Sequence, residues 1–155
     1  STSQTLHQGL STIRRHPSRG LPVLIEYARG TLCCMLEYSV IVPAYDEEVL
    51  LADTIGSLRK GMEEMPEIAG EIIVVDNNSS DRTASVARSA GAHVVFEPVN
   101  QISRARNAGA REARGECLLF VDADTQVPPR LLAQALAAMK AEKVGAGGST
   151  LHFAE

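Results

Sequence analysis

Residues 71–83 read Glu-Ile-Ile-Val-Val-Asp-Asn-Asn-Ser-Ser-Asp-Arg-Thr, an apolar run that ends in an acidic residue and a polar loop. Residues 38–42 and 117–121 are further apolar runs of strand length, and each is also followed by acidic residues. Continuous apolar strands, without alternation, are typical of parallel sheets that helices cover on both faces. The pattern therefore predicts an α/β fold with a mostly parallel, doubly wound sheet.

Helical segments alternate with the strands. We expect strands over residues 38–42, 71–75, 93–96 and 116–121, and helices over residues 47–62, 81–90, 101–114 and 128–141. A fifth strand is expected within residues 144–153, after which the domain reads as truncated. Pro43 is predicted to end the first strand, and Asn100 to cap the third helix. Because crossovers between parallel strands are right-handed, every strand-to-helix loop should lie at one edge of the sheet.

A chain of 155 residues, of which 45% are hydrophobic, is long enough for one buried core. Its net charge of -4 argues against a nucleic-acid partner held by bulk positive charge. No apolar run approaches the about 18–20 residues of a membrane span. Cys33, Cys34 and Cys117 suggest neither a disulfide framework nor a zinc site, so we expect a cytoplasmic protein, with attachment at the inner face of a membrane left open.

The first 37 residues differ from the rest of the chain. They are rich in arginine, lack a sustained hydrophobic period and are interrupted by proline and glycine. One hypothesis starts the domain near Met35, so that residues 1–34 come from a misassigned start or an artificial addition. The alternative is a native helical arm. We therefore divide the chain into an extension, residues 1–37, and a domain, residues 38–155, that is incomplete at its C-terminus.

Acidic residues follow three of the expected strands. Asp46 and Glu47 follow the first, Asp76 ends the second, and Asp122 and Asp124 end the fourth. At one edge of a parallel sheet these carboxylates would repel one another unless a cation or a hydroxyl-bearing ligand lay between them. A divalent metal with a sugar nucleotide meets both needs.

The acidic residues also have plainer interpretations. The pair Asp122 and Asp124, with one residue between them, suits Mg²⁺ or Mn²⁺, which take one or two protein carboxylates and complete their shell with phosphate and water. The same spacing occurs in solvated turns and helix caps. Asp76 suits a hydrogen bond from a nucleoside, but it would equally cap the loop of residues 77–80.

Two arginines open the third helix. Arg104 and Arg106 lie where a cation opposes the helix dipole, and a helix N-terminus with arginine suits a phosphate. An ion pair with Glu97 or Glu112 is the alternative for either residue.

Several other site types find no support. The four histidines are scattered and form no arrangement with serine or cysteine. No GxxxxGK[ST] motif is present, which excludes a P-loop kinase or ATPase, and no GxGxxG motif follows a strand.

Four segments in order resemble the motifs of family 2 glycosyltransferases of the GT-A fold. They are residues 39–48, 71–83, 103–109 and 115–124, and the resemblance covers about residues 38–150. The first motif usually has asparagine where this chain has Asp46. The resemblance implies a nucleotide-diphospho-sugar transferase fold and a donor of the UDP- or GDP-sugar type.

The resemblance also implies the site residues. Nucleotide-sugar contacts would come from Pro43, Ala44, Tyr45, Glu47, Asp76, Arg104, Asp122 and Ala123. The ligands of Mg²⁺ or Mn²⁺ would be Asp122, Asp124 and Gln126. The position of Gln126 resembles one that joins the metal shell in the dolichol-phosphate-mannose synthase branch.

The expected function is transfer of a sugar from a nucleotide-sugar to an unknown sugar, lipid or protein acceptor, in cell-envelope polysaccharide or glycolipid biosynthesis. No catalytic base is identified, because only Glu155 is a candidate among residues 145–155. The alternative is a truncated, non-catalytic nucleotide-sugar-binding module. A nucleotidyltransferase is a third hypothesis, although the loop of residues 43–48 lacks glycine. An exposed last strand would favour a homo-oligomer.

Overall fold

The computed structural model describes residues 36–141. In chain order its elements are β1 (Tyr38–Ala44), α1 (Leu51–Glu63), β2 (Gly70–Asp76), α2 (Thr83–Ser89), β3 (His93–Phe96), α3 (Ile102–Glu112), β4 (Cys117–Phe120) and α4 (Pro129–Lys140). The proposed extension, up to residue 35, and the strand expected within residues 144–153 lie outside the described residues. The alternation of strands and helices is as the sequence predicts.

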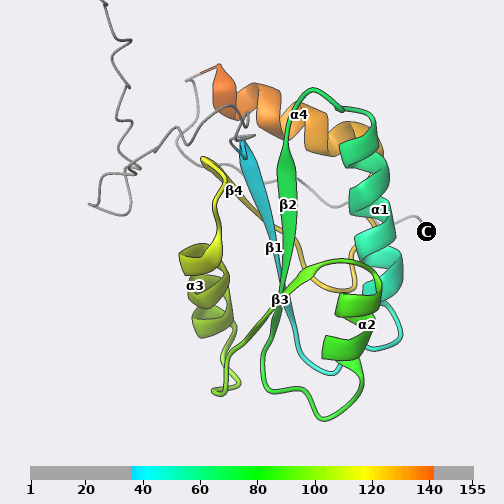
Figure 1. Ribbon diagram of the computed structural model, residues 1–155, viewed down its shortest axis with the longest axis vertical. Helices are drawn as coiled ribbons and strands as arrows, with labels where there is room; N and C mark the ends of the chain where they lie inside the picture. The colour runs from blue at the N-terminus through cyan, green and yellow to red at the C-terminus, as the bar shows by residue number, and fades with distance from the viewer. Residues whose placement is uncertain (1–35, 142–155) are drawn as a thin grey trace, which may run out of the picture. The chain divides into compact units, whose positions relative to one another are not determined.

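The four strands form one parallel sheet in the order β3-β2-β1-β4 (Figure 1). Val40 of β1 is level with Ile72 of β2 on one side and with Leu119 of β4 on the other. The chain moves outward from β1 through β2 to β3 and then returns to the opposite side of β1. The strand order therefore reverses between β1 and β4, which is where open α/β sheets bind ligands, beyond the carboxyl ends of the strands.

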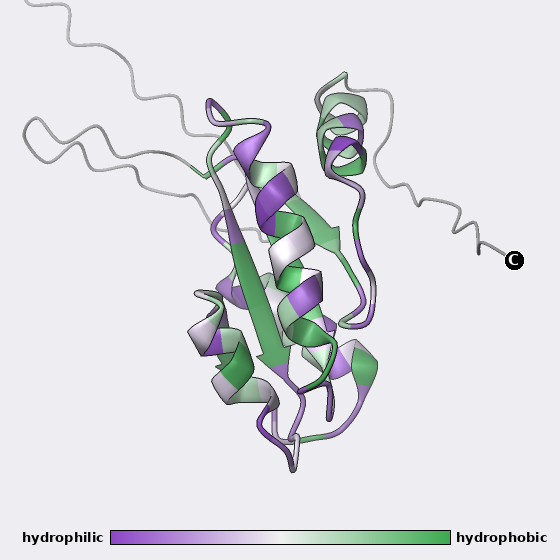
Figure 2. Ribbon diagram, turned by 90° about the vertical axis from the view of Figure 1, so that its right-hand side faces the viewer, coloured by the Kyte–Doolittle hydropathy of each residue, from purple (hydrophilic) through white to green (hydrophobic). Residues whose placement is uncertain are grey.

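Helices cover both faces of the sheet, as predicted. Helices α1 and α2 lie on one side and α3 on the other (Figure 1). Successive residues of β1 supply both cores: Val40 and Val42 pack into the core with α1, α2 and α4, whereas Ile41 packs into the core with α3. Figure 2 shows the strands as predominantly hydrophobic and the helices as mixed, which is the pattern of a sheet buried on both faces.

Strand β1 does not end before Pro43 but continues to Ala44. The carbonyl of Ile41 accepts the N–H of Val121 at 3.0 Å, so the backbone groups of Ile41 and of Pro43, two residues on, face β4. Proline has no N–H to donate on that side. Pairing with β4 accordingly stops at Ile41, while pairing with β2 continues to Ala44. Pro43 therefore limits the pairing of β1 with β4 but does not end strand β1.

All four helices begin one to four residues later than the hydrophobic pattern predicts, and α1 and α3 show what precedes them. Helix α1 begins at Leu51, and the N–H groups of Glu47 and Glu48 before it donate to the side chains of Thr83 and Asp81 at the start of α2. Helix α3 begins at Ile102, and Asn100 does not cap it: the N-cap residue is Gln101, whose N–H donates to the side chain of Asn77 at 3.0 Å. Neither helix has a side-chain hydrogen bond at its N-cap.

None of the helices within residues 36–141 combines the length and the apolar character that crossing a bilayer requires.

Two glycines in helices offer a matched test of the packing. A Cβ on Gly109 of α3 would lie 2.4 Å from a methyl group of Ile41, whereas a Cβ on Gly56 of α1 would meet nothing within 4 Å. We expect Gly109→Ala to destabilise the protein by about 1–3 kcal/mol through overpacking. Gly56→Ala should stabilise it by about 0.5–1 kcal/mol, because alanine loses less backbone entropy in a helix. Urea unfolding measures both, and equal effects would contradict this packing of α3.

Candidate functional site

Three loops meet at the carboxyl edge of the sheet, and together they hold the acidic residues singled out above. Glu47 lies in the loop after β1, Asp76 closes β2, and Asp122 and Asp124 follow β4. Burial raises the pKa of the Glu47 carboxyl above its ordinary value, and the charges of Asp124 and Asp81 raise it further. The loops after β1 and β4 are therefore close enough for their carboxylates to repel each other.

Asp76 is buried at the end of β2 and caps the loop that follows. Its Oδ1 accepts the N–H of Ser79 at 3.0 Å, so the capping interpretation is observed. Within residues 36–141, Oδ2 of Asp76 has no hydrogen-bond partner. The only side-chain nitrogen or oxygen there that is both fully buried and unpaired is the hydroxyl of Tyr38, so Oδ2 is not fully buried. Oδ2 therefore reaches solvent and remains able to accept a hydrogen bond from a ligand.

Arg104 forms an ion pair. Its Nε donates to Oε1 of Glu97 at 3.0 Å, as the plainer interpretation predicted. Hydrogen bonds from the N–H of Val99 and from Arg104 lower the pKa of Glu97. Asn77 completes this corner, since its side-chain amide donates to the carbonyls of Glu97 and Val99. In this structure Arg104 binds Glu97 and so stabilises the connection between β3 and α3. A nucleotide contact by Arg104 stays a prediction.

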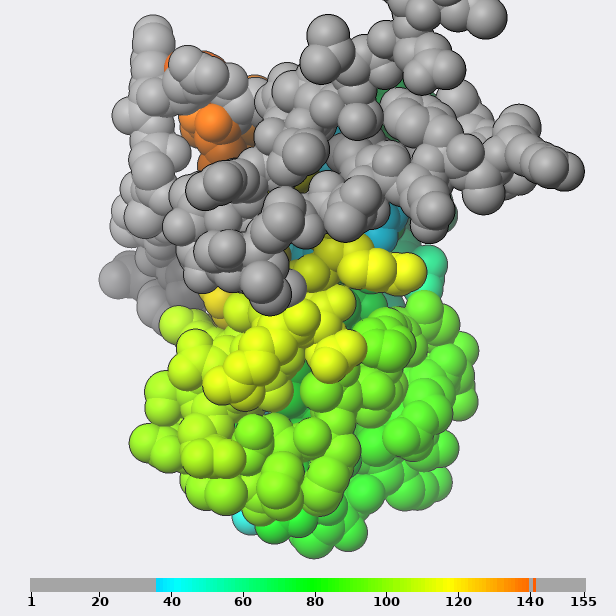
Figure 3. Space-filling model, turned by 60° about the vertical axis from the view of Figure 1, so that its left-hand side comes forward, coloured from blue at the N-terminus to red at the C-terminus, as the bar shows by residue number. Residues whose placement is uncertain are grey.

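Arg106, in contrast, faces the acidic motif. Its Nη2 lies 3.6 Å from Oδ1 of Asp122, and its guanidinium carbon lies 5.4 Å from the centroid of the Phe120 ring. In Figure 3, α3 and β4 form one continuous face, in yellow-green and yellow. Sequence reasoning placed Arg106 at a helix start but did not pair it with Asp122, because that contact depends on how α3 packs against β1 and β2.

Helix α1 fixes the backbone of the acidic motif. The hydroxyl of Thr54 donates to the carbonyl of Ala123 at 2.7 Å, and the N–H of Val127 donates to Oγ of Ser57 at 3.0 Å. Ala123 is buried, whereas Asp122 and Asp124 on either side of it are exposed. The two carboxylates thus project from an anchored turn. Neither Thr54 nor Ser57 was singled out in the sequence, although Thr54 lies within the buried stripe of α1.

The donor set of this turn suits a hard divalent cation. Asp122, Asp124 and the exposed Gln126 offer oxygen ligands to Mg²⁺ or Mn²⁺. Among the described residues there is no group of three acidic, histidine or cysteine side chains that could enclose a metal ion. A cation here would take the rest of its ligands from water or from a bound phosphate, as Mg²⁺ commonly does. The residues present therefore fit a metal that is shared with a phosphorylated ligand.

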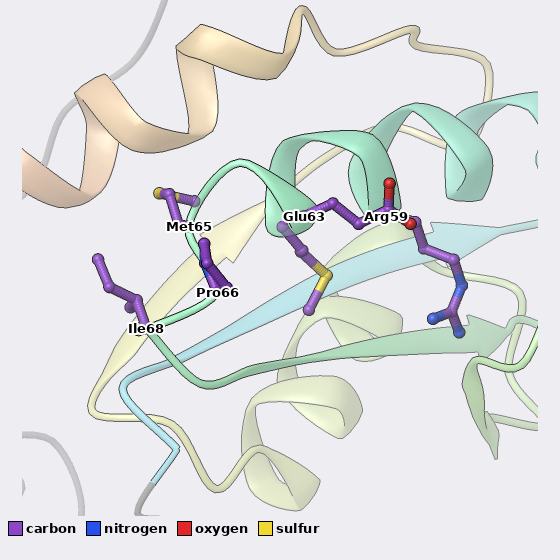
Figure 4. Close-up of a pocket in the computed structure, with 6 residues that line it drawn as sticks. Arg59, Glu63, Met65, Pro66 and Ile68 are labelled. Carbon is purple, nitrogen blue, oxygen red and sulfur yellow. The ribbon is translucent and has the colours of Figure 1, made fainter.

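Two hollows on the described surface lie away from these carboxylates. One, of about 250 Å³, lies at the end of α1 and is lined by Arg59, Met62, Glu63, Met65, Pro66 and Ile68 (Figure 4). The other, of about 440 Å³, lies between α1 and α2 and is lined by Ala52, Arg82, Ser85, Val86, Ser89 and Ala90. The candidate site is accordingly an open edge of loops, defined by its charges and backbone geometry.

Residues 39–154 match the model of glycosyl transferase family 2. Over 110 residues the chain is 31% identical to the poly(ribitol-phosphate) beta-N-acetylglucosaminyltransferase TarS of Staphylococcus aureus, covering 66% of this chain and 19% of TarS. Over 114 residues it is 37% identical to the dolichol-phosphate mannosyltransferase of Mycosarcoma maydis, covering 68% of this chain and 39% of that enzyme. The chain thus spans less than half the length of these relatives.

Solved structures agree with the sequence matches. TarS residues 1–349 in complex with UDP superimpose with a TM-score of 0.59 and 26% identity, covering 74% of this chain and 38% of that one. Glucosyl-3-phosphoglycerate synthase from Mycobacterium tuberculosis, in complex with Mn²⁺, UDP and glucosyl-3-phosphoglycerate, gives a TM-score of 0.56 and 25% identity, covering 66% and 39%.

The fold is that of the GT-A glycosyltransferases, as the sequence predicted. The chain belongs to glycosyl transferase family 2.

The raised pKa of Glu47 gives a test of the site's electrostatics. Since folding raises this pKa above its ordinary value of 4.5, the charged carboxylate opposes folding once the pH exceeds the folded-state value. Glu47→Gln should therefore raise the melting temperature by about 1–3 °C at pH 7, and the gain should vanish as the pH falls below the unfolded-state pKa. Calorimetric scans at several pH values measure this effect.

Glu63→Gln is the matched control, because Glu63 is an exposed carboxylate at the far end of α1. It should leave the melting temperature unchanged. A Glu47→Gln protein that melts at the wild-type temperature at pH 7 would contradict the close approach of the loops after β1 and β4.

Proposed function

We propose that this chain carries the donor-binding part of a glycosyltransferase that binds a UDP- or GDP-sugar together with Mg²⁺ or Mn²⁺. The observation that carries the proposal is the convergence of carboxylates from three loops beside the point where the strand order reverses. Solved relatives of the chain contain UDP, and one also contains Mn²⁺. Both ligands would relieve the repulsion among these carboxylates.

The proposed contacts divide between the nucleoside and the diphosphate. Near the nucleoside we place Pro43, Ala44, Tyr45, Glu47 and Asp76. Tyr45 is 48% exposed directly after β1, so its ring is available to a base or ribose. Oδ2 of Asp76 is available to accept a hydrogen bond from the same group. Arg104 stays a weaker candidate because Glu97 already holds its Nε.

The turn after β4 is proposed to hold the diphosphate end. Asp122 and Ala123 would line the ribose side, and Asp122, Asp124 and Gln126 would supply ligands to the cation. A bound divalent cation would neutralise charge on the nucleoside diphosphate as it leaves. Thr54 would keep the turn in place through the carbonyl of Ala123.

The transfer itself breaks the bond between the anomeric carbon of the sugar and the diphosphate oxygen. An acceptor hydroxyl forms the new bond and gives its proton to a base, and the nucleoside diphosphate leaves with the bonding electron pair. We assign residues 36–141 to the donor and the leaving group only. The relatives include a poly(ribitol-phosphate) beta-N-acetylglucosaminyltransferase and a dolichol-phosphate mannosyltransferase, so we propose an envelope polymer or a lipid-linked acceptor, reached from the cytoplasmic face of a membrane.

A nucleotide-sugar-binding module without transfer activity is the second candidate. It is favoured because the acidic residues proposed for the site, Glu47, Asp76, Asp122 and Asp124, are all assigned to the donor. Hydrolysis or transfer of a UDP- or GDP-sugar by the chain would exclude it. Binding of the donor without turnover would support it. A homo-oligomer stays a proposal, and sedimentation of the chain would test it.

Calorimetric titration of UDP and of GDP, each with and without Mn²⁺, tests the proposed donor site. We expect Mn²⁺-dependent binding of one nucleotide, weakened at least tenfold by Asp124→Ala, because that carboxylate supplies a metal ligand. Glu63→Ala removes a carboxylate at the other end of α1 and should bind as the wild type does. Equal binding by the Asp124→Ala protein, or no binding at millimolar nucleotide, would contradict the proposal.

A further inference from the structure

The loop between β1 and α1 is not held in place by apolar packing. Its large apolar side chains point outward: Tyr45 is 48% exposed, Val49 79% and Leu50 45%. The loop nevertheless carries Tyr45 and Glu47 of the proposed donor site. Some other interaction must therefore fix its conformation, because a loop without buried apolar contacts is expected to open easily.

Hydrogen bonds to Asp81, in the loop before α2, and to Thr83, the first residue of α2, supply this interaction. The N–H of Glu47 donates to Oγ1 of Thr83 at 2.8 Å, and the N–H of Glu48 donates to Oδ2 of Asp81 at 3.0 Å. Both acceptors lie more than 30 positions along the chain. The N–H groups of Glu47 and Glu48 lie just before α1, where backbone donors have no partner within the helix and would otherwise bind water. Here residues 81–83 bind both of them.

Asp81 and Thr83 act as a unit. Oδ1 of Asp81 accepts both the N–H and the hydroxyl of Thr83. A hydroxyl has one hydrogen to donate, so the hydrogen of Thr83 is directed to Asp81, and a lone pair of the same oxygen is left to accept the N–H of Glu47. These hydrogen bonds, with the one from Glu48, hold the pKa of Asp81 below its ordinary value despite the cost of desolvation. The carboxylate of Asp81 therefore orients the hydroxyl of Thr83, and it also binds the N–H of Glu48 directly.

Neighbouring contacts join the same two loops. Asp46 has a positive φ of 52°, its Oδ1 accepts the N–H of Ser80 at 2.7 Å, and its own N–H donates to Oγ of Ser79 at 3.1 Å. Aspartate and asparagine tolerate this backbone region better than most residues, so the exchange of the family's asparagine for Asp46 is accommodated here. Oε2 of Glu48 accepts hydrogen bonds from the backbone N–H and from Nε of Arg82, both at 3.0 Å.

We infer that Asp81 and Thr83 are positioning residues of the donor site, which hold the β1–α1 loop, and with it Glu47 and Tyr45, in the conformation that binds the nucleotide. The inference deepens the proposed function and rests on it. Neither side chain needs to touch the ligand. Their effect passes through the two amides of Glu47 and Glu48, so loss of the bonds should loosen the loop and weaken nucleotide binding together.

The test combines two measurements on the 155-residue chain. Amide hydrogen exchange, followed by NMR, reports whether the N–H groups of Glu47 and Glu48 are bound. Calorimetry with Mn²⁺ and UDP or GDP reports the affinity. The variants are Thr83→Val, which keeps the shape and removes the hydroxyl, Thr83→Ser, which keeps the hydroxyl, and Asp81→Asn, which keeps the shape and removes the charge.

We expect Thr83→Val to speed exchange at Glu47 at least tenfold and to weaken nucleotide binding about tenfold. Thr83→Ser should restore both values to near the wild type. Asp81→Asn should speed exchange at Glu47 and Glu48, because an amide cannot accept hydrogen bonds through its nitrogen. Asp53→Asn, which removes an exposed carboxylate from the first turn of α1, is the charge control and should change neither measurement.

Wild-type exchange rates in the Thr83→Val and Asp81→Asn proteins would overturn the inference, and so would faster exchange with unchanged affinity. Urea unfolding of each variant establishes that it is folded under the conditions of the measurement. If the wild-type chain binds neither nucleotide, the proposed function fails. The exchange rates alone then decide whether Asp81 and Thr83 hold this loop, so the two failures are distinguishable.

Discussion

Strand β1 is paired in parallel on both sides, and the position of every functional loop follows from that pairing. With β2 and β4 in register beside it, the three strands end at the same edge of the sheet, and so do the carboxylates that follow them. Parallel strands need crossovers, which place α1 and α2 on one face and α3 on the other. Pro43 adds a local limit, because it ends the pairing with β4 just before the acidic turn.

The edge of the sheet is organised by hydrogen bonds between loops more than by burial. Thr54 and Ser57 anchor the acidic turn to α1, and Asp81 and Thr83 anchor the loop after β1 to the start of α2. Such bonds fix backbone while leaving side chains in solvent. An open, acidic edge with an ordered backbone is suited to a ligand that brings a cation and hydroxyl groups.

The electrostatics of this edge also indicate a balance between stability and function. The carboxylate of Glu47 is partly desolvated and faces the charges of Asp124 and Asp81, so it opposes folding at neutral pH. Arg106 offsets one neighbouring charge by its contact with Asp122. A repulsive cluster of this kind is costly in the free chain, and the proposed cation would relieve it.

The sequence by itself determined the order of strands and helices, the parallel sheet and the edge at which the acidic residues meet, because apolar runs and the handedness of crossovers are local or general properties. It singled out Asp76, Asp122 and Asp124 as candidate site residues by their place after strands. Only the tertiary structure decided which distant segments hold the loops in place: the hydrogen bond between Thr54 of α1 and Ala123 spans 69 positions. Periodicity and capping rules reach only a few residues along the chain. The contacts that set this site form only when the helices and strands pack together.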